Sequence, residues 1–132
     1  MRLPIRIYYG DTDCGGVVYY AKYLTFFERG RTELLRELGV PMAKLNDEGV
    51  MFVVIKAEVK YLSPCRYDDL ITLDTQITET SGATITFSHS ITREGATAIA
   101  AQGITAVASI GRDGKPIRIP QEVRAAILGK RS

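Results

Sequence analysis

The chain has 132 residues, of which 45% are hydrophobic, and its 17 basic and 15 acidic residues give a formal net charge of +2. This length and apolar fraction predict a single domain over residues 1–132 with a hydrophobic core. The basic residues are scattered, which argues against a nucleic-acid surface. We find neither an apolar signal stretch nor a run of about 20 apolar residues, so we expect a cytoplasmic protein without an integral membrane segment.

The first half of the chain predicts a short strand and one long helix. Apolar residues alternate from Leu3 to Tyr9, which is typical of a strand. From Tyr23 to Leu38 they recur at spacings of three and four, which predicts an amphipathic helix that stops at Gly39. Gly30 lies in the middle of this helix and costs about 1 kcal/mol relative to alanine. We therefore expect a packed sheet to approach the helix backbone closely there.

The second half predicts four consecutive strands, because the period of the apolar residues changes to two. The expected strands cover residues 50–61, 69–78, 84–92 and 97–110, and short helices are expected at 42–48 and 120–128. The first of these strands is apolar on both faces over residues 50–54, so we expect it to start buried and to end with one face in water. Short turns make consecutive strands antiparallel, so the long helix must cover one face of a curved antiparallel sheet.

Few side chains in the sequence suit nucleophilic or metal chemistry. His89, the only histidine, is in phase with the apolar face of its strand, which predicts a buried, hydrogen-bonded structural residue. Cys14 lacks an evident base partner, and we expect a small buried residue in a tight turn. The two cysteines form no CxxC pair, which argues against zinc or a disulfide framework and for a reducing compartment.

The turn from Tyr9 to Tyr20 joins the first strand to the long helix. It combines aspartates with the flexible pair Gly15-Gly16 and places backbone N–H groups at a helix start, which favours developing negative charge. Asp11 and Asp13 lie two residues apart, but no further metal ligands suggest themselves nearby. Phosphate-binding glycine patterns are absent. Residue types and spacing alone favour a helix cap or an Asx-turn for either aspartate over a catalytic role.

Longer motifs around Asp13 favour a catalytic role instead. The segment from Tyr8 to Tyr19, followed by Tyr23 and Phe27-Glu28-Arg29-Gly30-Arg31, resembles the signature of the hotdog-fold thioesterases. The nearest branch is the 4-hydroxybenzoyl-CoA thioesterase and YbgC-like acyl-CoA thioesterase group. Residues 61–64 and 67–69 also resemble family features, so the similarity covers nearly the whole chain. It implies an α+β hotdog fold, in which a five-stranded antiparallel sheet wraps a long central helix.

The resemblance also implies roles for particular residues. Asp13 would attack a thioester carbonyl or activate a water, and the backbone N–H of Tyr20 would donate to the carbonyl oxygen. This chemistry needs neither a cofactor nor a metal. A second donor would fall near Met51. In the family the active site lies at a dimer interface, so we expect a homodimer or a homotetramer.

Further residues are expected to contact the substrate. Gly16 shapes the turn beside Asp13, and Tyr23 and Phe52 are candidate walls of an acyl pocket, although plain core positions fit them equally well. The second hairpin lacks the basic cluster with which the hydroxybenzoyl-CoA enzymes grip the nucleotide, which leaves open CoA or acyl carrier protein as the carrier. The remaining candidate partners for CoA phosphates are Lys60, Arg66, Arg93 and Arg112.

Two other functions fit the same fold. One is a non-hydrolytic protein that binds acyl-CoA or an acyl carrier, which the complete Asp13 motif disfavours. The other is a dehydratase, which would need a histidine near the helix entrance, whereas His89 lies in a late strand. The sequence leaves the acyl group, and the choice between a nucleophilic and a general-base role for Asp13, undetermined.

Overall fold

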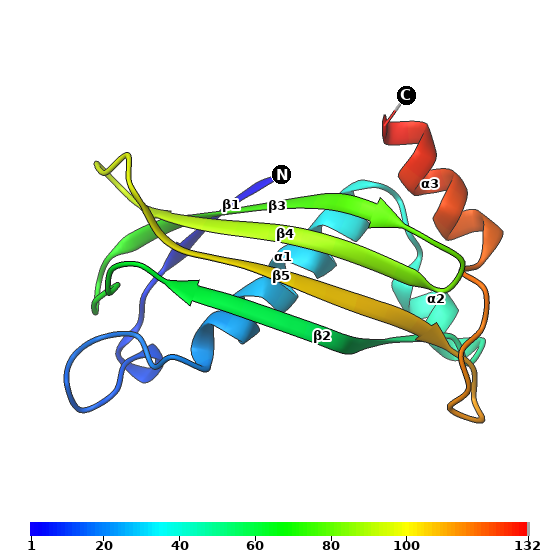
Figure 1. The fold of residues 1–132 in the computed structure, drawn as a ribbon, viewed down its shortest axis with the longest axis horizontal. Coiled ribbons are helices and arrows are strands. Elements are labelled where there is room, and N and C mark those ends of the chain that lie inside the picture. Colours follow the sequence, from blue (N-terminus) through cyan, green and yellow to red (C-terminus); the bar gives the residue numbers. More distant parts are fainter. Residues whose placement is uncertain (132) are drawn as a thin grey trace.

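One long helix packs against a five-stranded antiparallel sheet (Figure 1). The computed structural model describes the backbone of residues 1–131 and the side chains of residues 1–129. Its elements are β1 (Arg2–Arg6), a 3-10 turn (Tyr9–Asp11), α1 (Lys22–Glu37), α2 (Met42–Asp47), β2 (Met51–Tyr61), β3 (Leu70–Thr80), β4 (Thr84–Arg93), β5 (Ile99–Ile110) and α3 (Gln121–Arg131). The strand order is β1-β3-β4-β5-β2. The predicted α+β class and element order are confirmed.

The end of β1 differs from its predicted boundary. The strand was expected to continue to Tyr9 but ends at Arg6. The chain turns there because the Tyr8 N–H donates to the Asp11 carboxylate at 2.8 Å, which closes the 3-10 turn. This turn directs the following loop toward the start of α1.

The middle of α1 lies directly on the sheet, as the mid-helix glycine predicted. A Cβ atom on Gly30 would overlap Thr75 Oγ1 and would lie 2.9 Å from Leu73 Cδ2. Both neighbours belong to β3. The absence of a side chain at Gly30 therefore sets the distance between the helix and the sheet.

Replacing Gly30 with alanine is expected to lower the free energy of unfolding by about 1–3 kcal/mol. Overpacking against Thr75 outweighs the gain of about 1 kcal/mol in helix propensity. Urea denaturation measures the difference. Gly129→Ala is the matched control, because a Cβ on this α3 glycine meets nothing within 4 Å. Equal effects of the two substitutions would contradict the close approach.

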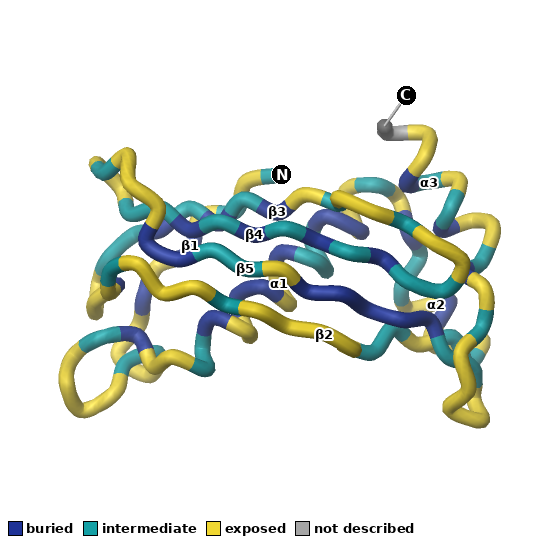
Figure 2. Tube along the Cα trace, in the orientation of Figure 1, coloured by how far each residue is buried: buried dark blue, intermediate teal, exposed yellow. Residues whose placement is uncertain are grey.

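The exposure of β2 corrects one prediction. This strand was expected to start buried, but the exposed fractions of Met51, Val54 and Ile55 are 48%, 50% and 59%. The reason is its place at the edge of the sheet, where it pairs only with β5 (Figure 2). An apolar strand with an unpaired edge is a template for pairing with another chain.

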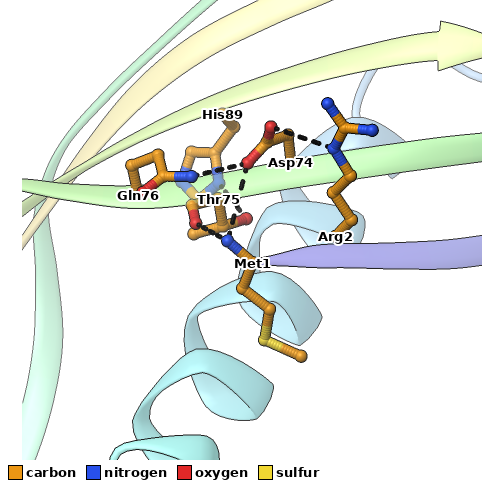
Figure 3. Close-up of polar contacts among 6 residues, drawn as sticks. All are labelled: Met1, Arg2, Asp74, Thr75, Gln76 and His89. Atoms are coloured by element: carbon orange, nitrogen blue, oxygen red, sulfur yellow. Dashed lines mark hydrogen bonds and ion pairs between the residues drawn. The ribbon is translucent and has the colours of Figure 1, made fainter. Parts of the chain in front are cut away.

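His89 is buried and hydrogen-bonded, as predicted. Its Nδ1 lies 3.1 Å from Thr75 Oγ1 and its Nε2 lies 2.8 Å from Thr105 Oγ1. The imidazole stacks on Phe27 with 4.3 Å between the ring centroids. On the other side of Thr75, the N-terminal amino group of Met1 donates to the Thr75 carbonyl at 3.2 Å (Figure 3). This histidine is a structural link between β3, β4 and β5.

The charge state of His89 predicts a pH-dependent stability. Burial, assisted by the positive charge of Arg31, lowers the pKa of His89 from 6.5 to about 3. The folded state therefore keeps the imidazole neutral while the unfolded state binds a proton below pH 6.5. The free energy of unfolding is expected to fall by up to about 1.4 kcal/mol per pH unit below pH 6.5. Above pH 6.5 His89 is neutral in both states and should not change the free energy of unfolding. Urea denaturation between pH 7 and pH 5 measures how the free energy of unfolding changes with pH. The glutamine in His89→Gln does not titrate, so this variant should show a smaller slope. An equal slope in both proteins would contradict the prediction.

Candidate active site

Asp13 lies in a tight turn that projects from the fold between β1 and α1. Its backbone N–H donates to the Val17 carbonyl at 2.9 Å, and its carbonyl accepts the Gly16 N–H at 3.0 Å. Its carboxylate Oδ1 accepts the Gly15 N–H at 2.8 Å. Gly16 has a φ of 82°, a conformation that glycine adopts without strain. For Asp13 the Asx-turn alternative is thus confirmed, and the helix-cap alternative is wrong because α1 begins later, at Lys22.

Contacts on two sides fix the position of this turn. On one side, the Val18 N–H donates to the carbonyl of the buried Cys65 at 2.8 Å. On the other side, the carboxylate of Asp11 lies 3.2 Å from Lys22 Nζ at the start of α1, and the Asp11 carbonyl accepts the Tyr19 N–H at 3.0 Å. The Asp13 carboxylate itself stays exposed to solvent.

The start of α1 supplies an unpaired backbone donor. The first turn of the helix uses the N–H groups of Lys22 and Leu24, which donate to Tyr19 and Ala21 carbonyls at 2.9 and 3.2 Å. Within residues 1–131, the N–H of Tyr20 has no hydrogen-bond acceptor. A free N–H at a helix N-terminus, aligned with the macrodipole, stabilises negative charge on a nearby atom.

Asp13, Tyr20 and Tyr23 line one surface cavity of about 370 Å³. The remaining wall comes from Val17 and Val18 of the turn, from Tyr61 at the end of β2, and from residues 62–64, which follow it. Figure 1 shows the loop that precedes α1 at the same end of the molecule as the C-terminal end of β2. The structure therefore places Asp13, Tyr20 and residues at the end of β2, which are far apart in sequence, around one cavity.

Met51 and Phe52 are not part of this cavity. They lie at the opposite end of β2 from Tyr61. At about 3.3 Å per residue, the length of the strand separates them from Tyr61 by roughly 30 Å. Within one chain they lie too far away to line the Asp13 cavity.

The basic candidates occupy different places. The Arg66 backbone pairs with Val17 of the turn, and its side chain forms no hydrogen bond or ion pair with the described part of the chain. Lys60 lies in a second cavity of about 380 Å³ over β2, β4 and β5, which does not include Asp13. Arg93 donates to Ser63 Oγ and to the Pro64 carbonyl, both at 2.8 Å, and so supports the cavity wall. Arg112 is bonded to the Asp47 carbonyl, beside α2 at the other end of the molecule.

Two features of the site differ from expectation or were missed. Cys14 is exposed, not buried, because the turn that carries it projects into solvent. Tyr61 was recognised only as part of a family motif, yet its phenol donates to the Tyr20 carbonyl at 2.8 Å. The sequence gives only a weak indication that residues 61–64 form a cavity wall, because Pro64 predicts merely that the strand ends there.

Neither a metal site nor a membrane span is found in the described residues. No group of three or more His, Cys, Asp or Glu side chains in residues 1–129 could hold a metal ion. Among the helices of residues 1–131, none combines the length and apolarity needed to cross a membrane.

Comparisons with known proteins identify the family to which the chain is similar. The family described as the thioesterase-like superfamily matches residues 8–127. The acyl-CoA thioesterase YbgC of Haemophilus influenzae is 41% identical over 124 residues, covering 93% of this chain and 90% of that protein. The acyl-CoA thioester hydrolase YbgC of Escherichia coli O6:H1 is 47% identical over 90 residues, covering 68% of this chain and 67% of that protein.

A solved structure extends the likeness to three dimensions. The crystal structure of a probable thioesterase from Bartonella henselae superposes with a TM-score of 0.82 at 35% identity, covering 91% of this chain and 98% of that chain. The match of the family over most of the chain, together with these relatives, identifies the fold as a hotdog fold. The chain belongs to the thioesterase-like superfamily.

Proposed function

We propose that the protein hydrolyses an acyl-CoA thioester to a free acid and CoA, with Asp13 as the reacting carboxylate. The observation that carries this proposal is the shared cavity, which is lined both by Asp13 and by Tyr20, the residue with the unpaired N–H. The acyl-CoA thioesterases among the relatives support the choice of substrate.

The chemistry follows from these two groups. The Tyr20 N–H binds the thioester carbonyl oxygen and stabilises the negative charge that develops there. In the nucleophilic route, Asp13 attacks the carbonyl carbon, the C–S bond breaks to release CoA thiolate, and water then hydrolyses the mixed anhydride. In the general-base route, Asp13 takes a proton from the attacking water and that proton ends on the CoA sulfur. Thioesters are reactive enough for either route to proceed without a histidine.

The working site is proposed to form between two copies of the chain. The first half of the edge strand β2 exposes apolar side chains, and in residues 1–131 its outer side pairs with no other strand, so it can pair with β2 of a second copy. Antiparallel pairing about a two-fold axis at Lys56, the midpoint of β2, places Met51 of each copy opposite Tyr61 of the other. Met51 and Phe52 of the second copy would then reach the Asp13 cavity. We leave open whether two such dimers form a tetramer.

The CoA phosphates are assigned to Arg66 and Lys60. The side chain of Arg66 has no partner in residues 1–129, and its backbone is paired with the turn that carries Asp13. Lys60 is exposed and precedes Tyr61 of the cavity wall. Arg93 and Arg112 are excluded from this role by their contacts with the fold.

A screen for free-thiol release over short, long and aromatic acyl-CoAs tests the proposal. We expect steady release from at least one class, with the Asp13→Asn variant as the inactive control. Protection against thermal unfolding by acyl-CoA without any thiol release would contradict hydrolysis and identify a binding protein instead.

A further inference from the structure

The carbonyl oxygen of Tyr20 is left unused by the helix. In a regular α-helix this oxygen would accept the N–H four residues on, but the Leu24 N–H donates to Ala21 instead. Within residues 1–131 no backbone N–H donates to the Tyr20 carbonyl. Its partner is the phenol of Tyr61, which donates to it at 2.8 Å. A side chain from the end of β2 therefore caps the residue that carries the unpaired N–H.

The Tyr61 ring is itself well positioned for this contact. Its backbone is fixed by pairing with Ala101 of β5. Its ring packs edge-on against the buried Tyr23 of α1, with 5.3 Å between the ring centroids. Partial burial, and the nearby Tyr20, raise the pKa of the Tyr61 phenol, so the hydroxyl keeps its proton and remains a donor at neutral pH.

The two peptide units that flank Tyr20 are held from different directions. The peptide that contains the Tyr20 N–H is fixed through the Tyr19 carbonyl, which accepts the Lys22 N–H at 2.9 Å. The next peptide, which contains the Tyr20 carbonyl, is fixed by Tyr61. Rotation about the bonds of the Tyr20 Cα is restricted only when both peptides are held. Removing the second contact frees the Tyr20–Ala21 peptide, so that the direction of the Tyr20 N–H is then held from one side only.

We propose that Tyr61 is a positioning residue whose phenol holds the Tyr20 peptide so that the unpaired N–H points into the Asp13 cavity. This inference rests on the proposed thioester hydrolysis, in which that N–H stabilises the oxyanion. Tyr61 does not need to contact the reacting atoms. It acts through the backbone of Tyr20, so its loss affects the transition state more than substrate binding.

The test is Tyr61→Phe, which keeps the ring and its contact with Tyr23 but removes the donor. Turnover number kcat is expected to fall by about three- to tenfold, as for a lost neutral hydrogen bond, while KM stays unchanged. Tyr67→Phe is the matched control, because this exposed tyrosine contacts Tyr9 by its ring and does not line the cavity. Unchanged kcat in Tyr61→Phe, or a higher KM at constant kcat, would overturn the inference.

The amide NMR spectrum gives a readout that does not depend on activity. The Ala21 N–H belongs to the peptide whose carbonyl accepts the Tyr61 hydroxyl, so its resonance should shift in Tyr61→Phe, together with that of Tyr20. Both resonances should stay in place in Tyr67→Phe. Unmoved Tyr20 and Ala21 resonances in Tyr61→Phe would overturn the inference even if the wild-type protein hydrolysed no acyl-CoA, a result that would contradict only the proposed function.

Discussion

Replacement of Asp13 with asparagine is expected to lower kcat on acyl-CoA by roughly a thousandfold or more without unfolding the protein. An amide can neither attack the thioester carbonyl nor accept a proton from water. It does retain the side-chain oxygen that accepts the Gly15 N–H, so the Asx-turn and the position of the loop should survive. The substitution therefore separates the chemical role of the carboxylate from its structural role.

The measurement compares initial rates of thiol release and acyl-CoA binding for the two proteins. Asp68→Asn is the matched control, because Asp68 is an exposed aspartate with a φ of 71°, which asparagine tolerates well. This control should keep the wild-type rate, and Asp13→Asn should still bind substrate. Hydrolysis by Asp13→Asn near the wild-type rate would remove Asp13 from the mechanism.

The fold could be predicted because its elements leave clear periods in the sequence. The three- and four-residue spacing from Tyr23 to Leu38 corresponds to the helical face that packs on the sheet, and Gly30 marked the point of closest approach. The position of β2 in the sheet could not be predicted. An apolar edge strand that lacks a partner within its own chain has the same composition as a buried strand, so Met51 and Val54 were placed inside.

The site was predictable only in part. Residue types identified an acidic turn at Asp13, and only the longer motif distinguished catalysis from an Asx-turn. An Asx-turn does not remove Asp13 from the cavity, because Asp13 accepts the Gly15 N–H through its carboxylate and is also one of the cavity's lining residues. The contact between Tyr61 and the Tyr20 carbonyl joins residues 41 apart and depends on strand register, which has no local sequence pattern.

Two inactive variants are expected to restore activity when they share a dimer. If Asp13 of one copy works with the Met51 region of the other, Asp13→Asn and Met51→Pro damage complementary halves of each site. Met51→Pro removes the N–H that the family resemblance assigns as a second donor, and the first residue of a strand tolerates proline. In a mixed dimer, one site then has both its Asp13 and its Met51 intact.

Co-expression with two different affinity tags yields the mixed dimers for assay. Random pairing of the two chains should recover about a quarter of wild-type activity, because about half of the dimers are mixed and each has one intact site. Asp13→Asn paired with Tyr20→Pro is the control, since both residues lie in the same copy's part of the site and no intact site can form. Purified mixed dimers of Asp13→Asn and Met51→Pro that stay inactive would contradict a shared site. Recovery in the control pair would show instead that Asp13 of one copy works with Tyr20 of the other, which would contradict their assignment to one cavity of the same chain.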